Sequence, residues 1–379
     1  MPEMIPVNEP LFGEKELAYV TDCVRTGWVS SAGKYINEFE EKWSAYCGRK
    51  YGVAVANGTV ALQLAVAALE LESGSEIIMP SFTIISCAAA AIYNNCIPVF
   101  ADCDPETWCI TVDEIVPGIT EKTRAIMPVH IYGHPAEMDP IINVAKKHGL
   151  AVIEDAAEAH GAEYLSNCGG KETWKRCGSF GDVSCFSFYA NKLVTTGEGG
   201  MLVTDNGQLA ERARLLRNLA FEPDRRFHHA ELGFNFRFTN IQAALGLAQV
   251  ERMDEIIERK RRMANYYSNN LAGIDGLQLP VERDWARSVY WMYGIVIHED
   301  TGMNAAQFAA KLKEREVDTR PFFLGLHAQP ALKSYMNFTE NDFPVTNRIA
   351  RQGLYLPSGL ALTEEQQAVV CKAVREVLS

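Results

Sequence analysis

Residues 184–200 read SCFSFYANKLVTTGEGG, and this stretch combines two patterns. The first five residues alternate small and aromatic side chains, which is the period of a half-buried strand. Lys192 follows, a Gly-rich turn comes next, and residues 201–204 resume as a strand. A lysine at such a junction is partly desolvated, which lowers its pKa towards the range of a base or a Schiff-base former. Taken alone, the stretch favours a surface lysine in a loop, but three other stretches reverse that weighting.

The composition is typical of a soluble globular enzyme with about two domains. The chain has 379 residues, of which 47% are hydrophobic and 22% are charged, and its formal net charge is -12. This acidic balance, without any Lys/Arg-rich block, argues against a nucleic-acid partner. The 10 cysteines contain no CxxC pair. We therefore expect free thiols in a reducing cytosol, and neither a disulfide framework nor a metal site.

No membrane segment is predicted. Residues 1–12 lack a basic region followed by an apolar one, so they do not resemble a signal peptide. The most apolar stretch, residues 77–101, is interrupted by Pro80 and Pro98. We therefore expect a cytoplasmic protein without a membrane partner.

The order of the elements predicts an α/β fold. The strands are expected at residues 51–56, 76–79, 97–101, 123–129 and 151–154. Helices are expected at residues 14–26, 34–46, 60–71, 86–93, 112–119 and 138–148. This alternation predicts a mainly parallel, doubly wound sheet whose ligands bind beyond the carboxyl ends of the strands. His130, Asp155 and Lys192 follow such strand ends.

The turn Asn57-Gly58-Thr59 opens an Ala/Leu-rich helix directly after a predicted strand. A small polar turn at a helix start exposes free N–H groups at the positive end of the helix dipole, which suits a phosphate. The alternative is a plain helix cap formed by Asn57 or Thr59.

The rest of the chain is expected to form a long surface loop, a crossing helix and a second domain. We predict the loop at residues 161–181 and one long helix from Ile241 past Asn265. The expected domains are residues 1–250, with an N-terminal arm, and the smaller α/β domain 251–379.

Four features of this chain together match the needs of pyridoxal 5'-phosphate. That cofactor requires a lysine for a Schiff base, a carboxylate for the pyridine nitrogen, an anion site for the phosphate and a surface against the ring. Lys192, Asp155, the Gly58-Thr59 helix start and Ser187 supply these parts in order. A capping carboxylate is the alternative reading of Asp155, but finding all four features together favours the cofactor site.

Several motifs carry a family resemblance. They are residues 128–134 (PVHIYGH), 152–159 (VIEDAAEA), 186–192 (FSFYANK), 196–200 (TGEGG) and 233–240 (GFNFRFTN). With them the chain resembles the DegT/DnrJ/EryC1/StrS aminotransferases, pyridoxal-phosphate enzymes that act on nucleotide-linked keto sugars. The resemblance covers nearly the whole chain. It implies an aspartate-aminotransferase-type (fold type I) architecture, with a large domain built on a mainly parallel sheet and a smaller C-terminal α/β domain.

The resemblance also implies a role for particular residues. Lys192 would bind the cofactor and shuttle a proton, Asp155 would pair with the pyridine nitrogen, and Glu158 would lie near the ring hydroxyl. The phosphate would be held by Gly58, Thr59 and Ser187, and by Asn235 from the other subunit of a homodimer with shared active sites. The implied substrate-binding residues are His327, Trp28 and Arg237.

Within the family, the resemblance implies that L-glutamate aminates C4 of GDP-4-keto-6-deoxymannose. The alternatives are a UDP-linked 4-keto sugar, amination at C3, a sugar dehydratase, or a non-catalytic protein with the same fold. Dehydratases of this fold carry histidine at the position of Lys192, which argues against that activity. The chain departs from many relatives in having Ile84 where an aromatic ring stacks on the cofactor, and in a longer loop at residues 166–177.

Overall fold

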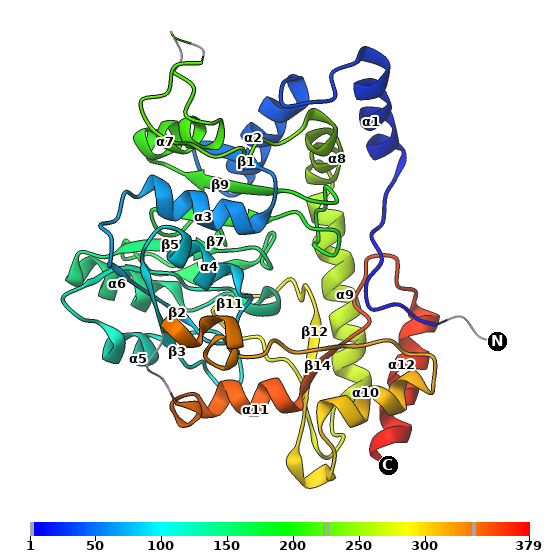
Figure 1. Ribbon diagram of the computed structural model, residues 1–379. Helices are drawn as coiled ribbons and strands as arrows, with labels where there is room; N and C mark the ends of the chain where they lie inside the picture. The colour runs from blue at the N-terminus through cyan, green and yellow to red at the C-terminus, as the bar shows by residue number, and fades with distance from the viewer. Residues whose placement is uncertain (1–3, 223–224, 226, 336–338) are drawn as a thin grey trace.

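A computed structural model of the chain describes residues 4–222, 225, 227–335 and 339–379 (Figure 1). Its central sheet has seven strands in the order β1-β9-β8-β5-β4-β2-β3. Their bounds are β1 (Tyr51–Val55), β2 (Glu76–Pro80), β3 (Ile97–Ala101), β4 (Thr123–Ile126), β5 (Ala151–Asp155), β8 (Val183–Ser187) and β9 (Gly200–Thr204). Strands β8, β5, β4, β2 and β3 pair in parallel, and β9 is antiparallel to both of its neighbours. The predicted mainly parallel sheet is thus confirmed.

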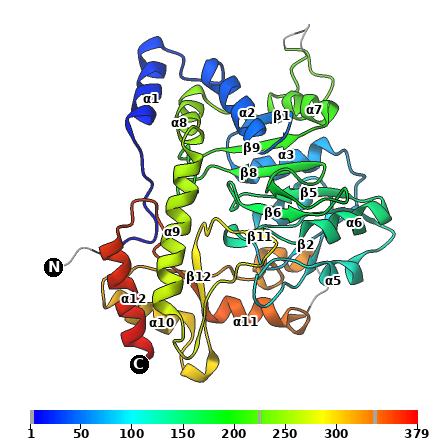
Figure 2. The same ribbon diagram turned by 180° about the vertical axis from the view of Figure 1, so that it is seen from behind.

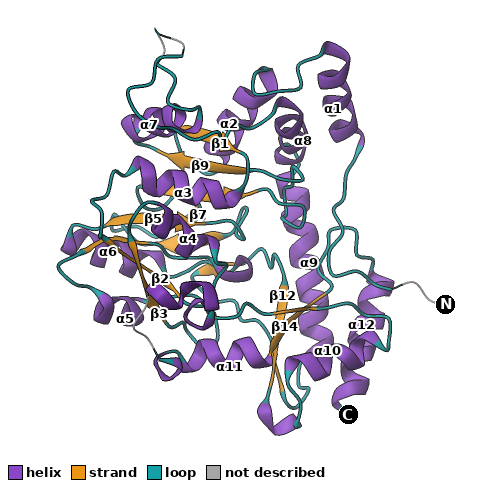
Figure 3. Ribbon diagram, in the orientation of Figure 1, coloured by secondary structure: helices purple, strands orange, loops and turns teal. Residues whose placement is uncertain are grey.

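Helices flank this sheet, as Figure 3 shows. In the first part of the chain they are α1 (Glu14–Thr26), α2 (Lys34–Tyr46), α3 (Gly58–Ala68), α4 (Ser86–Tyr93), α5 (Val112–Ile115), α6 (Met138–His148) and α7 (Gly207–Arg217). The later helices are α8 (Asn240–Val250), α9 (Met253–Leu271), α10 (Ala305–Lys313), α11 (Pro344–Gln352) and α12 (Glu364–Leu378). The strands are nearly fully buried, as expected for a sheet that is covered on both faces.

Two smaller antiparallel sheets complete the fold. One has the order β10-β12-β14-β13 and the other the order β11-β6-β7. Their strands are β6 (Glu163–Ser166), β7 (Thr173–Arg176), β10 (Leu277–Gln278), β11 (Ala286–Arg287), β12 (Tyr293–Ile297), β13 (Arg320–Pro321) and β14 (Gly353–Leu356).

The predicted surface loop at residues 161–181 is wrong. Strands β6 and β7 form a hairpin there, with Tyr164 opposite Lys175 and Leu165 opposite Trp174. Strand β11 joins its edge from more than a hundred residues further along the chain. Such long-range pairing is absent from any local sequence pattern, so the Gly-rich composition alone suggested a loop.

The predicted long helix beyond Ile241 is also wrong, because two helices occupy this region. Helix α8 ends at Val250 and α9 begins at Met253. Glu251 forms a salt bridge with Lys15 at 2.8 Å, and Arg252 forms one with Glu16 at 3.0 Å. These contacts attach the two linking residues to α1, and the non-helical backbone of Arg252 (φ -129°, ψ 29°) separates the two helices.

The hydrophobic core consists of two clusters. The larger one surrounds the central sheet, and the smaller one includes Tyr267, Tyr293 and Val374 from α9, β12 and α12. Ile5 of the N-terminal arm packs into the smaller cluster and forms a backbone bridge with Val317. Both Figure 1 and Figure 2 accordingly draw the N-terminal segment beside α12. The domain division at residues 250 and 251 stays a prediction.

All ten cysteines are free, and each is buried except Cys168. Over the residues that the structure describes, no helix is both long and apolar enough to cross a lipid bilayer.

Candidate active site

Lys192 lies in the turn after β8, at the carboxyl edge of the central sheet. Its side chain is 9% exposed, and its Nζ lies 3.7 Å from Oε1 of Glu158. The same Nζ lies 3.5 Å from the centroid of the Trp291 ring. Burial lowers the pKa of Lys192, while the charges of Glu158 and Asp155 oppose that shift. The desolvated environment that the sequence indicated for this lysine is therefore present.

Glu158 is the acidic partner of this lysine. Its Oε2 accepts the backbone N–H of Tyr132 at 2.8 Å, and the residue is 6% exposed. Burial raises the pKa of the Glu158 carboxyl to about 7, against the opposing effect of Lys192. Burial raises the pKa of the acid and lowers that of the amine, so it reduces the free-energy cost of transferring a proton between them.

Asp155 is the last residue of β5, and its carboxylate is buried at the same edge of the sheet. Oδ1 accepts the backbone N–H of Ala157 at 3.0 Å, and Oδ2 accepts the thiol of Cys87 at 3.2 Å. Burial raises the pKa of Asp155, while these hydrogen bonds and the charge of Lys192 lower it. A positively charged group beside this carboxylate would stabilise its ionised form.

The start of α3 contacts the end of β8. A Cβ atom at Gly58 would lie 2.6 Å from Cβ of Ser187. Any residue other than glycine at this position would therefore force Ser187 to move. Asn57 caps the helix by accepting the N–H of Val60 at 3.0 Å, as the capping alternative predicted. The hydroxyl of Thr59 lies 2.8 Å from that of Ser86 at the start of α4. Backbone and hydroxyl donors from three elements thus converge beside the helix terminus.

His327 lies on a different loop from the lysine. Its Nδ1 is 2.6 Å from the Ser81 hydroxyl, which follows β2, and its Nε2 is 3.0 Å from Oδ1 of Asn347. The ring stacks on Phe343 with centroids 4.2 Å apart. Ser81 belongs to the same strand-end loop as Ile84, whose side chain is 44% exposed. His327 is therefore tied to the loop that carries the unusual aliphatic residue.

Asn235 and Arg237 lie beside the end of β1. Val55 forms an antiparallel bridge with Arg237, and the N–H of Ala56 donates to the carbonyl of Phe236 at 3.0 Å. Asn235 itself is exposed. The expected contact of Asn235 with the phosphate site of another subunit stays a prediction.

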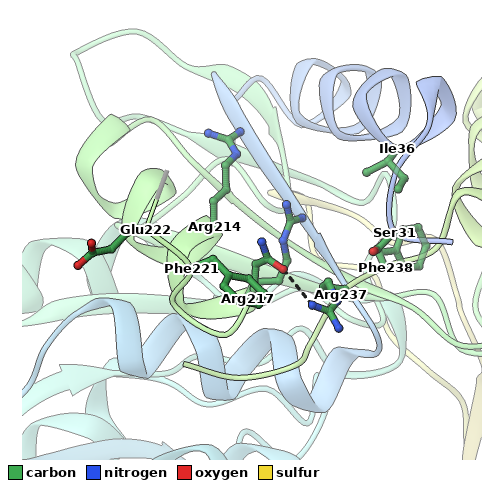
Figure 4. Close-up of a pocket in the computed structure, with 9 residues that line it drawn as sticks. Ser31, Ile36, Arg214, Arg217, Phe221, Glu222, Arg237 and Phe238 are labelled. Atoms are coloured by element: carbon green, nitrogen blue, oxygen red, sulfur yellow. Dashed lines mark hydrogen bonds between the residues drawn. The ribbon is translucent and has the colours of Figure 1, made fainter. Parts of the chain in front are cut away.

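Arg237 also lines a cavity of about 550 Å³ (Figure 4). Arg214 and Arg217 line the same cavity, together with Phe221, and Arg237 donates to Oδ1 of Asn218 at 3.1 Å. The cavity is therefore basic and has one aromatic wall. Glu222 also lines the cavity, and of the residues that follow it, 223, 224 and 226 lie outside the described residues.

Trp28 is 57% exposed and does not join the cluster around Lys192. Its carbonyl accepts the side-chain amide of Asn240 at 2.7 Å. Together with Lys34 and Tyr35, it lines a separate cavity of about 450 Å³. The structure thus keeps this predicted substrate residue on the surface near α1 and α2.

A buried polar network supports the strand that carries Asp155. His130, Glu154 and Cys177 bring their potential ligand atoms within 4.8 Å of one another, which resembles a metal site. However, Nδ1 of His130 accepts the N–H of Ala136, so the ring carries its proton on Nε2 and donates to Glu154 at 2.8 Å. Glu154 also accepts hydrogen bonds from two backbone N–H groups and the Ser184 hydroxyl. The arrangement is a satisfied hydrogen-bond network.

We expect Glu154→Gln to lower the free energy of unfolding by about 2–4 kcal/mol. The NH2 group of glutamine would point at hydrogen-bond donors that now bind the carboxylate, so these donors would lose their acceptor. Burial raises the pKa of Glu154, but its hydrogen bonds outweigh that effect and lower the pKa overall. Urea denaturation measures the change. Glu163→Gln is the matched control, since Glu163 pairs with the half-exposed Arg287 at 2.7 Å. This substitution is expected to lower the free energy of unfolding by less than about 1 kcal/mol. Equal losses in both variants would contradict this reading.

Sequence reasoning missed three residues of the site: Trp291, Tyr132 and Cys87. Cys87 follows the end of β2 by a few residues, so the rule that ligands gather at carboxyl ends could have found it. Tyr132 acts through its backbone N–H at a left-handed position, φ 51°, which no side-chain pattern signals. Trp291 lies about a hundred residues from Lys192, and no local pattern connects the two.

Comparison with known proteins matches the chain to one family. The model of the DegT/DnrJ/EryC1/StrS aminotransferase family matches residues 10–375. The chain is 40% identical over 375 residues to the GDP-perosamine synthase of Caulobacter vibrioides, covering 99% of this chain and 98% of that one. The GDP-perosamine synthase of Escherichia coli O157:H7 is 38% identical over 375 residues, with 99% of each chain covered.

Solved structures agree with the sequence comparison. The aminotransferase TlmJ from Streptoalloteichus hindustanus superposes with a TM-score of 0.90 at 29% identity, covering 99% of each chain. DesI, whose structure was determined in the presence of its TDP-sugar product, has a TM-score of 0.89 at 31% identity, covering 100% of this chain and 94% of that one. These likenesses confirm the predicted fold type. With a family match over nearly its whole length, the chain belongs to the DegT/DnrJ/EryC1/StrS aminotransferase family.

Proposed function

We propose that this protein is a pyridoxal-phosphate aminotransferase that moves the amino group of L-glutamate to C4 of GDP-4-keto-6-deoxymannose, which yields GDP-perosamine. The observation that carries the reaction is the buried Lys192 amine beside Glu158, with Asp155 at the same sheet edge. The observation that carries the substrate is the 40% and 38% identity to two GDP-perosamine synthases over almost the full chain.

The residues present fit pyridoxal phosphate. At Gly58 the start of α3 packs directly against Ser187, which brings the Ser187 hydroxyl beside the helix N-terminus, a combination that suits a phosphate. The hydroxyls of Thr59 and Ser86 lie there as further donors. Asp155 offers a buried carboxylate for a protonated ring nitrogen, and Lys192 offers the amine.

When bound, the cofactor would act as an electron sink and carry the amino group between the two substrates. Lys192 would hold the proton that moves to and from the reacting carbon, because burial brings its amine closer to a useful basicity. Glu158 would lie near the ring hydroxyl, and its carboxylate, with Oε1 3.7 Å from Nζ of Lys192, would favour the charged form of that amine. Asp155 would stabilise positive charge on the ring throughout.

The substrate contacts belong to the same proposal. His327 would bind the sugar, since its ring reaches Ser81 at the carboxyl edge of the sheet. Arg237 and Trp28 would be further substrate-binding residues, and the basic cavity at Arg237 supports an anionic ligand there. The proposal includes a cytoplasmic homodimer in which the exposed Asn235 reaches the phosphate site of the partner subunit.

Visible absorption tests cofactor and substrate together. Purified protein supplied with pyridoxal phosphate is expected to turn yellow, to lose that absorbance with glutamate, and to regain it when GDP-4-keto-6-deoxymannose is added. Recovery requires that the keto sugar accept the nitrogen, so it reports the complete reaction. Proton NMR of the product then distinguishes amination at C4 from amination at C3.

A UDP-linked 4-keto sugar is the matched control substrate. If only the UDP-linked sugar restores the absorbance, the aminotransferase reaction stands and the GDP-perosamine assignment is wrong. If no yellow species forms even with added cofactor, the role proposed for Lys192 is wrong.

A further inference from the structure

Lys260 of α9 is an unusual residue, because lysines are rarely buried without a charged partner. It is 2% exposed, and its Nζ donates to the carbonyl oxygens of Trp291, at 2.9 Å, and Ser358. Among the described residues it forms no salt bridge with a carboxylate, and burial alone lowers the pKa of Lys260 to about 7. This amine therefore connects α9 to the backbone of two loops rather than to an acid.

Trp291, one of the two residues that Lys260 holds, contacts the turn of Lys192 directly. Trp291 is 4% exposed, and its indole N–H donates to the carbonyl of Asn191 at 2.7 Å. Asn8 of the N-terminal arm donates to the same carbonyl at 3.2 Å. The face of the ring lies 3.5 Å from Nζ of Lys192. Two hydrogen bonds thus fix Trp291: its backbone carbonyl accepts one from Lys260, and its indole N–H donates one to Asn191.

The same scaffold also holds Glu158. A Cβ atom at Gly133 would lie only 2.8 Å from the backbone nitrogen of Trp291, so this turn packs directly against the tryptophan. Tyr132, in the same turn, donates its N–H to Glu158 at 2.8 Å. The two groups that contact the Lys192 amine, an aromatic face and a carboxylate, are therefore positioned by one packed unit.

A small cavity of about 10 Å³ joins the two lysines. Lys192, Lys260 and Trp291 line it, together with Ser358 and residues of the N-terminal arm. A cavity of this size holds about one water molecule. Lys260 thus borders the same small cavity as Lys192.

The Lys192 amine has charged and titratable neighbours on several elements. They are Glu158 and Asp155 after β5, His160 in the following turn, Lys260 across the small cavity, and Glu9 of the arm. Glu158 and Asp155 raise the pKa of Lys192, and burial lowers it. The electron-rich face of Trp291 favours the ammonium form, so loss of the ring should lower that pKa further.

We propose that Trp291 is a positioning residue for Lys192, and that Lys260 acts through Trp291 by holding its backbone. The inference rests on the proposed catalytic role of Lys192. Between the two half-reactions the lysine amine is free, and a flexible side chain must stay within reach of the reacting carbon. The indole face gives the ammonium form a fixed, apolar docking surface, and the Glu158 carboxylate favours the same charged form.

The first test measures the amine itself in cofactor-free, full-length protein. Reductive methylation at a series of pH values, followed by mass spectrometry of the peptide that contains Lys192, gives the pKa of this amine. In Trp291→Leu we expect that pKa to fall by about 0.5 to 1 relative to the unmodified sequence. Lys260→Met should shift it in the same direction by a smaller amount, because the ring remains but its anchor is lost. Thermal unfolding checks that each variant is folded.

The second test measures turnover in the cofactor-loaded enzyme. Trp291→Leu should lower kcat by about tenfold or more, with KM for the keto sugar changed less than about threefold. Trp291→Phe keeps an aromatic face and should retain most of kcat. Trp174→Leu is the matched control, since Trp174 packs against Arg287 at 4.0 Å and away from Lys192.

An unchanged or raised Lys192 pKa in Trp291→Leu overturns the proposal, and so does a loss of kcat equal to that in Trp174→Leu. If Trp291→Leu does not fold, Trp291→Phe and Lys260→Met decide the question by the same labelling. Failure of the proposed function looks different, because the protein with its natural sequence would then lack glutamate-dependent turnover. In that case the labelling still shows whether Trp291 affects the pKa of the Lys192 amine.

Discussion

Lys192→Ala is expected to abolish amino transfer, with a loss of at least about 10³-fold in kcat. No other amine among the described residues contacts Glu158 or lies at the carboxyl edge beside Asp155. Lys260 is the nearest candidate in the lining of the small cavity, but its Nζ is engaged by two backbone carbonyls. Formation of 2-oxoglutarate from glutamate measures the loss, and the absence of lysine-bound cofactor absorbance accompanies it.

Lys311→Ala is the matched control for this variant, since Lys311 is an exposed residue of α10. It should retain full activity. Removal of Lys192 also relieves a buried charge, so we expect Lys192→Ala to unfold at a temperature close to that of the natural sequence. A folded Lys192→Ala protein with normal turnover would rule out the proposed mechanism.

Asp155→Asn is expected to lower kcat by about 10²- to 10⁴-fold. Asparagine keeps the shape of the side chain and still accepts the N–H of Ala157. It loses the negative charge that would stabilise a protonated ring nitrogen, together with the oxygen that accepts the Cys87 thiol. Steady-state kinetics with saturating glutamate and keto sugar measure the loss, and cofactor titration checks that binding persists.

Asp182→Asn is the matched control, because the Asp182 carboxylate accepts the N–H of Val152 at the opposite end of β5, at 2.8 Å. It changes the same chemical group far from the carboxyl edge and should leave kcat within about threefold. A loss below about tenfold in Asp155→Asn, equivalent to roughly 1.4 kcal/mol, would count against the role of Asp155.

Much of the fold was predictable because its helices and strands carry strong local signals. The helices at residues 14–26, 34–46, 86–93 and 138–148 have the predicted bounds. Helix α9 has different bounds because the non-helical backbone of Arg252, which forms a salt bridge to α1 that a local pattern does not contain, separates it from α8. The hairpin of β6 and β7 was missed for a similar reason, since its edge is completed by β11.

Part of the candidate site was likewise predictable from the sequence, and part was not. Asp155 and Lys192 were found because they lie at or just after strand ends, and the carboxyl ends of parallel strands meet at one edge of a sheet. Glu158 was found only through the family resemblance. Lys192 and its motif, and with them the family, follow from the order of residues along the chain. The environment of the Lys192 amine does not follow from that order. Trp291 reaches Lys192, and Lys260 reaches Trp291, only because the C-terminal part packs across that edge. Burial, ring contact and the opposing pKa shifts of Lys192 and Glu158 depend on distances in space, which only the tertiary structure sets.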